Sequence, residues 1–197
     1  MISIRNVIDN NTKTFHNHRL DAHEPIGQRL LATGGIAFLL ALFTGSNISD
    51  FLDAVITVQA ILIGFSFSVM FFLVSEDVKP ATVETGSIEA ARKAAQANRV
   101  AGEIFHNVSY YNLVAMLCLG LALVLLVPAR IFTVPDFLAP LYREQPMIGD
   151  FLNASGKAGR FVMLAAFYFL LLESAFTFSR SIARVSFLFE QKIRPGR

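Results

Sequence analysis

Residues 51–74 read FLDAVITVQAILIGFSFSVMFFLV, and this stretch decides the fold class. Its one charged residue, Asp53, lies near the beginning of the run. At about 1.5 Å per residue, a helix of this length crosses a hydrocarbon core of about 30 Å. A helix of a soluble domain normally carries a broad polar face, whereas only uncharged polar residues interrupt the rest of this run: Thr57, Gln59, Ser66 and Ser68. We therefore interpret residues 51–74 as a transmembrane helix.

The composition of the whole chain agrees with a lipid environment. Of its 197 residues, 54% are hydrophobic and 16% are charged, against about 25% charged residues in a soluble domain. The net charge of +2 is small, and no basic run interleaved with aromatic residues is present, so nucleic acid is not an expected partner. Because Cys118 is the single cysteine of the chain, no intramolecular disulfide can form. It lies in an apolar segment, and we interpret it as a packing residue.

Three further apolar stretches have the length needed to cross a bilayer. The transmembrane helices are predicted at about 28–45, 51–74, 104–127 and 160–180. Residues 1–27 form a polar N-terminal arm, and residues 28–197 form the membrane domain. The sequence therefore predicts an all-α integral membrane protein built as a four-transmembrane-helix bundle.

The segments between and after these spans have distinct compositions. From Ser87 the sequence SIEAARKAAQANRVAGE has high helix propensity and no breaker, which predicts a cytoplasmic helix over 87–103 that continues into the third span. Residues 128–159 contain four prolines and are predicted to form a small Pro-rich extracytoplasmic cap. Residues 181–197 are predicted to form an amphipathic tail that extends past the membrane or bends along its surface.

The distribution of basic residues predicts the orientation of the chain. Most of the seventeen Lys and Arg lie in the N-terminal arm, in residues 75–103 and in the C-terminal tail. The turn between the first two spans has none. Cytoplasmic loops carry an excess of Lys and Arg, so both termini are predicted to be cytoplasmic in a multi-pass protein of the inner (plasma) membrane.

Small residues recur every four positions on the first two spans. Such spacing lets a second helix backbone approach closely. Because the two spans are joined by a short turn, we predict that they form a close helical hairpin. The helix-packing residues are Thr33, Ala37 and Ala41 on the first span and Ala60, Gly64 and Ser68 on the second.

One carboxylate lies inside the fourth span. A lone charge at this depth costs a few kcal/mol, so Glu173 is expected to be protonated, paired or exposed to a wet cavity. Arg180, two turns on, is a candidate partner. An ion or proton pathway, or a gate, is one reading; a hydrogen-bond network that fixes helix register is the other. The predicted intramembrane polar layer consists of Glu173, Asn112, Tyr111, Ser109, Ser66, Ser68 and Thr177.

Other chemistry-bearing residues give weaker signals. His106, at the start of the third span, is a candidate pH-sensitive group, or an interfacial histidine without a special role. The three histidines of the N-terminal arm match no established ligand spacing, so neither a metal nor a cofactor is expected. The chain has no phosphate-binding glycine loop and no H-E-x-x-H, G-x-S-x-G or C-x-x-C motif, and an enzyme is not expected.

Three functions remain open at this stage. The first is a bacterial-type homo-oligomer that forms a channel, a pore or another membrane-perturbing assembly. The second is a non-conducting membrane anchor, scaffold or sensor that recruits a soluble partner through residues 87–103 and the C-terminal tail, for example in a stress or antiviral defence system. The third is a proton-coupled transporter that uses Glu173.

Overall fold

The computed structural model describes residues 4–14, 16–17, 22–23, 26–44, 48–75, 88–127 and 146–193. Apart from one pair of two-residue antiparallel strands, the regular elements of these segments are helices. In chain order the elements are α1 (Ile4–Lys13), β1 (His16–Asn17), β2 (Ala22–His23), α2 (Ile26–Phe43), α3 (Ser49–Ser75), α4 (Ile88–Leu126) and α6 (Pro146–Ile193).

Four of these helices are long and apolar enough to cross a membrane. Their apolar segments have mean hydropathies between 1.6 and 2.1, and the prediction of an all-α chain with four candidate spans is confirmed. The segments are Ile26–Phe43, Ser49–Phe71, Arg99–Leu126 and Ala154–Ser186.

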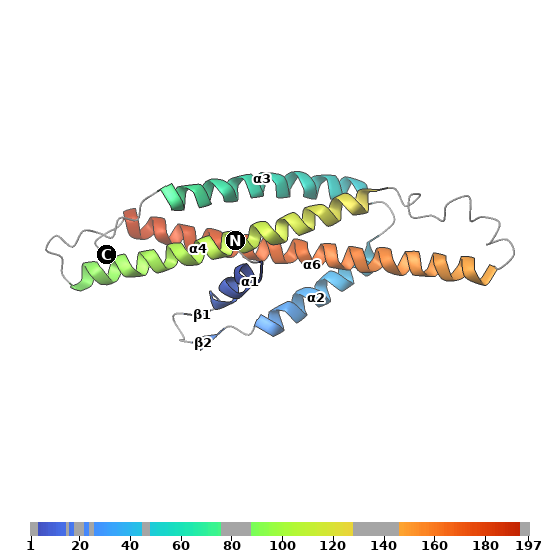
Figure 1. Cartoon of the computed structure of the whole chain (residues 1–197), viewed down its shortest axis with the longest axis horizontal. Coiled ribbons are helices and arrows are strands. Elements are labelled where there is room, and N and C mark those ends of the chain that lie inside the picture. The colour runs from blue at the N-terminus through green and yellow to red at the C-terminus, as the bar shows by residue number, and fades with distance from the viewer. Residues whose placement is uncertain are drawn as a thin grey trace.

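Helices α4 and α6 run antiparallel and form the centre of the bundle (Figure 1). Helix α2 packs against α6, and α3 packs against α4. Figure 1 shows α2 and α3 on opposite sides of the central pair, although they are neighbours in the sequence. The short helix α1 packs on α4.

The close hairpin predicted for α2 and α3 is wrong, because these two helices make no extended contact. The small residues of α2 do face a helix: Ala37 and Ala41 are buried and belong to a core shared with α6. On α3, by contrast, Ala60 and Gly64 are exposed on the side away from α4. Small side chains permit close approach of two backbones, but they do not select the partner.

Helices α4 and α6 are longer than a bilayer requires. Helix α4 runs without interruption over 39 residues, as the breaker-free sequence predicts. Helix α6 has 48 residues and begins at Pro146, so residues 146–159, predicted as part of the cap, continue into the fourth span as one helix. Proline is favoured at the first turn of a helix, and single glycines cost only about 1 kcal/mol each, which explains why this segment is helical. Residues 128–145 of the predicted cap lie outside the described residues.

The predicted C-terminal tail continues α6 as a helix. Residues 181–193 belong to the same uninterrupted element as the fourth span, and residues 194–197 lie outside the described part of the chain. At about 1.5 Å per residue, α4 is about 60 Å long and α6 about 70 Å long, against about 30 Å of hydrocarbon. Both helices are therefore longer than the hydrocarbon core of a bilayer is thick.

The apolar core lies where α2, α3, α4 and α6 come together. Phe167 and Cys118 are fully buried there, which agrees with a packing role for the cysteine. The ring of Phe38 meets the ring of Phe161 edge-on, at 5.2 Å between centroids. Close packing of this kind holds helices together in lipid, where the surrounding chains are as apolar as the side chains.

The α2–α6 contact predicts a position-specific effect of side-chain size. Replacing buried Ala37 by Phe places a ring where α2 touches α6 and should lower the free energy of unfolding by about 1–3 kcal/mol. Thermal unfolding of the purified protein in detergent measures the change. The control is Ile36→Phe at the adjacent position, which is 51% exposed. Equal stability of the two variants would contradict the packing described here.

Candidate functional site

Glu173 of α6 lies inside the bundle and is only 1% exposed. Its Oε1 atom accepts a hydrogen bond from Nη2 of Arg29, in the first turn of α2, at 2.8 Å. The guanidinium of Arg29 also lies over the ring of Phe176, 4.4 Å from its centroid. A buried carboxylate is tolerated when an opposite charge offsets its loss of hydration. Of the three states expected for Glu173, the structure shows the paired one.

The two oxygens of the Glu173 carboxylate have different surroundings. The hydroxyl of Tyr110 on α4 lies 3.4 Å from Oε1, a long contact. The second carboxylate oxygen, Oε2, is buried and has no hydrogen-bond partner among the described residues. Thr177 lies close by, but its hydroxyl donates to the backbone carbonyl of Glu173 rather than to the carboxylate. The described contacts therefore hold the carboxylate at Oε1, through Arg29 of α2 and, at a longer distance, Tyr110 of α4.

Neither Arg29 nor Tyr110 belonged to the predicted layer. Arg29 falls inside the predicted first span and is the only charged residue of α2. That isolation was a usable signal, because two opposite charges in separate spans tend to pair. Tyr110 was missed because the adjacent Tyr111 was chosen, and adjacent residues of a helix point about 100° apart.

A second polar cluster joins α3, α4 and α6. Gln59 of α3 donates from Nε2 to the hydroxyl of Ser174 on α6 at 2.7 Å. The hydroxyl of Tyr111 on α4 donates to Oε1 of Gln59 at 3.1 Å. All three side chains are buried. Because each polar atom is removed from water, this cluster fixes how the three helices are aligned.

The other members of the predicted layer do not extend these two clusters. Ser66 donates to Asn112, whose amide also contacts the sulfur of Met70 at 3.5 Å, and this pair joins α3 to α4. The hydroxyls of Ser109 and Ser68 donate to carbonyls of their own helices. The predicted single layer is therefore several separate contacts.

A further polar cluster fastens α1 to the central pair of helices. The backbone carbonyl of Thr14 accepts hydrogen bonds from Arg180 and Arg184 of α6. The hydroxyl of Thr14 donates to Asn107 of α4 at 2.8 Å. Arg184 also lies 3.4 Å from a carboxylate oxygen of Glu103. Cations beside the last carbonyls of a helix offset the negative end of its dipole, so Arg180 anchors α1.

Histidines contribute less to the described structure. His106 is half-buried, and the centroid of its ring lies 5.9 Å from that of Phe105. Its pH-sensitive role stays a prediction. His16 and His23 are partners in the β1–β2 register. Within the described segments, no three potential metal-ligating side chains come together.

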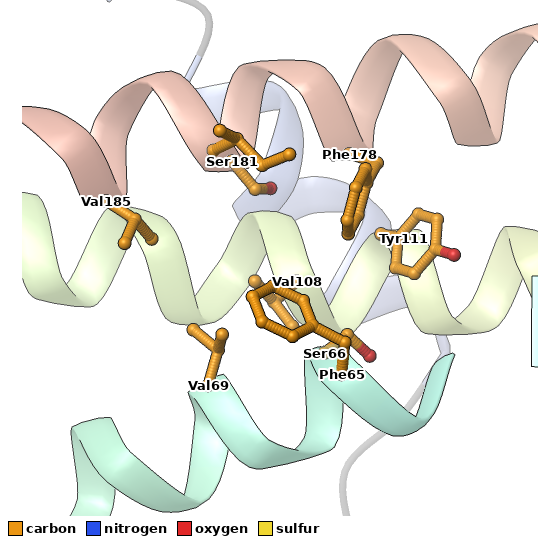
Figure 2. Close-up of a pocket in the computed structure, with 9 residues that line it drawn as sticks. Phe65, Ser66, Val69, Val108, Tyr111, Phe178, Ser181 and Val185 are labelled. Atoms are coloured by element: carbon orange, nitrogen blue, oxygen red, sulfur yellow. The ribbon is translucent and has the colours of Figure 1, made fainter. Parts of the chain in front are cut away.

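A small apolar cleft opens between α3, α4 and α6 (Figure 2). Its volume is about 90 Å³, and Phe65, Val108 and Phe178 are among its walls. The polar side chains at its edge are already bonded within the chain; Ser181, for example, donates to the carbonyl of Thr177 at 2.9 Å. The cleft therefore does not link the polar clusters into one hydrophilic path.

No protein-family model matches this chain, and no similar curated protein or solved structure is found. Function is therefore inferred from the residues and contacts described above.

The Gln59 cluster predicts a measurable coupling between α3 and α6. Gln59→Leu leaves the Tyr111 hydroxyl without its acceptor and should lower the free energy of unfolding by about 0.5–2 kcal/mol. A double-mutant cycle with Ser174→Ala should give a coupling of about 0.6 kcal/mol or more. Ser179→Ala is the matched control, because that exposed hydroxyl donates to the carbonyl of Ala175 on its own helix. A coupling of zero would show that the hydrogen bond does not join the helices.

Proposed function

We propose that this protein is a homo-oligomeric channel of the inner (plasma) membrane, in which copies meet through the outer face of α3. This outer stripe consists of Asp53, Thr57, Ala60, Gly64 and Ser68, and all five are exposed. The side chains that α3 buries, such as Gln59 and Ser66, lie on the opposite face, against α4. One face of α3 therefore packs within this chain, and the opposite face carries exposed side chains that are small or polar.

The outer stripe supports contact between copies for two reasons. A Cβ atom added at Gly64 would meet nothing within 4 Å, so packing within the chain does not require a glycine there. Small residues at helical spacing let two backbones approach, and in lipid such close packing drives association. An oligomer formed this way has rotational symmetry, with equivalent α3 helices around one axis.

Conduction is proposed along that axis rather than through a single chain. Inside the chain, the side chains of Glu173, Gln59 and Ser174 are bonded between helices, and the cleft between α3, α4 and α6 is apolar. A path between copies would instead use the outer stripe, where Asp53 and the Thr57 and Ser68 hydroxyls lie. A ring of aspartates favours cations over anions, so the proposed channel conducts cations.

The second candidate function is a non-conducting anchor or sensor with both termini in the cytoplasm. The observation that favours it is the length of α4 and α6, which exceed the thickness of a bilayer. Their projecting parts offer a helical surface for a soluble partner, around residues 88–103 and 187–193. Proton-coupled transport by Glu173 has less support, because the carboxylate is paired with Arg29 and enclosed.

Substitution of Gly64 tests the proposed function. Gly64→Leu fills the outer stripe with a bulky side chain and should reduce the oligomeric fraction tenfold or more, with a matching loss of current. Chemical cross-linking in liposomes measures assembly, and planar bilayers measure conduction. Gly120→Leu is the control, because Gly120 is also exposed and has no atom within 4 Å of an added Cβ, but lies on α4 among lipid-facing residues.

The outcomes separate the two candidates. Loss of both assembly and current in Gly64→Leu, with the control unchanged, supports the channel. Assembly without any current in the unaltered protein overturns conduction and favours the anchor, which then predicts capture of a soluble partner that depends on residues 88–103. An unaltered protein that remains monomeric in liposomes overturns assembly through α3.

A further inference from the structure

We propose that α1 lies in the interface between lipid and water, with Ile4 and Ile8 inserted among the acyl chains of the bilayer. The partner of this exposed apolar face is therefore lipid, rather than a second copy of the chain or a soluble protein. The placement of α1 does not depend on assembly through α3 or on conduction.

Polar contacts hold the C-terminal end of α1 at one end of the spans. The backbone carbonyl of Thr14, the residue after α1, accepts hydrogen bonds from Arg180 and Arg184, which lie in the apolar segment of α6. The hydroxyl of Thr14 donates to Asn107, in the apolar segment of α4. Figure 1 shows α1 close to the level at which α2 begins, along the long axis of the bundle.

The length of α4 relates this attachment to the bilayer. The apolar segment of α4 ends at Leu126. At about 1.5 Å per residue, about 20 residues cross 30 Å of hydrocarbon, and counting back from Leu126 reaches Asn107. Because Asn107 bonds Thr14, α1 is attached where the hydrocarbon core meets the headgroups.

Three faces of α1 can be distinguished, because successive residues of a helix point about 100° apart. Asn11 and Thr14 face the bundle and are buried. Ile4 and Ile8, four residues apart, share a second face and are 63% and 41% exposed. Asn6 is also exposed and points about 160° away from Ile8. This arrangement suits an interfacial helix beside a bundle, with protein at its side, lipid on the isoleucine face and water on the opposite face.

Two neighbouring features favour lipid as the partner of the isoleucine face. Ile182, between the two arginines that hold α1, is exposed on α6, so the lipid-facing surface of the spans reaches the depth of α1. Arg5, next to Ile4, is exposed, and its Nε atom lies 3.8 Å from a carboxylate oxygen of Asp9. An exposed pair of this kind is weak, and a guanidinium binds the phosphate of a lipid headgroup more strongly. The long stem of Arg5 can follow the apolar surface while its charge stays among the headgroups.

Tryptophan substitution on α1 tests this placement, because the chain contains no tryptophan of its own. Ile8→Trp and Ile4→Trp are made singly in the full chain, with Asn6→Trp as the matched control on the opposite exposed face. Each variant is placed in nanodiscs whose phospholipids carry bromine near the carboxyl end of the acyl chains. The loss of fluorescence relative to unbrominated lipid measures contact with lipid. We expect quenching of Ile8→Trp and Ile4→Trp to be at least about threefold stronger than quenching of Asn6→Trp.

Two results would overturn the proposal. Long-wavelength emission without quenching at both isoleucine positions would show that this face of α1 meets water. Short-wavelength emission without quenching would show that protein, such as a second copy of the chain, covers it. Tryptophan itself favours the interface, but Asn6→Trp carries the same preference, so a difference between the positions reports the placement of the helix. The measurement requires neither assembly through α3 nor current, so its failure is distinguishable from failure of the proposed channel.

Discussion

The structure depends on the need of every buried polar group for a partner that lipid does not provide. Glu173 shows this most clearly, because a carboxylate inside a span must be offset by another group of the protein. Arg29 supplies that offset from a different helix. Gln59 and Asn112 follow the same rule, each bonded to a side chain of a neighbouring helix. Polar contacts of this kind, together with close packing, determine which helices lie together.

These contacts explain why the chain is not a row of sequential hairpins. In water, burial of apolar surface would hold adjacent helices together, but in lipid that driving force between helices is absent. Polar contacts and local fit select the neighbours instead. Arg29 and Ala37 direct α2 to α6, and Gln59 and Ser66 direct α3 inward to α4 and α6. The central pair α4–α6 consequently separates two helices that are neighbours in the sequence.

The two flanking helices therefore differ in what they offer to function. Among the described elements, helix α2 packs extensively only against α6, and a charge pair ties its first turn to that helix. Helix α3 is bonded on its inner face, while a Cβ atom added at Gly64, on its outer stripe, would meet no described atom within 4 Å.

The sequence alone determined the four spans, the continuous helix of α4 and the presence of one carboxylate that needs a partner, because these follow from local composition and periodicity. It did not predict that partner, which lies 144 residues away, nor the helical start of α6 at Pro146. Only the tertiary structure decided which helices pack together. Small residues and polar side chains are compatible with several neighbours, and the choice among them depends on side-chain geometry across helices distant in the chain.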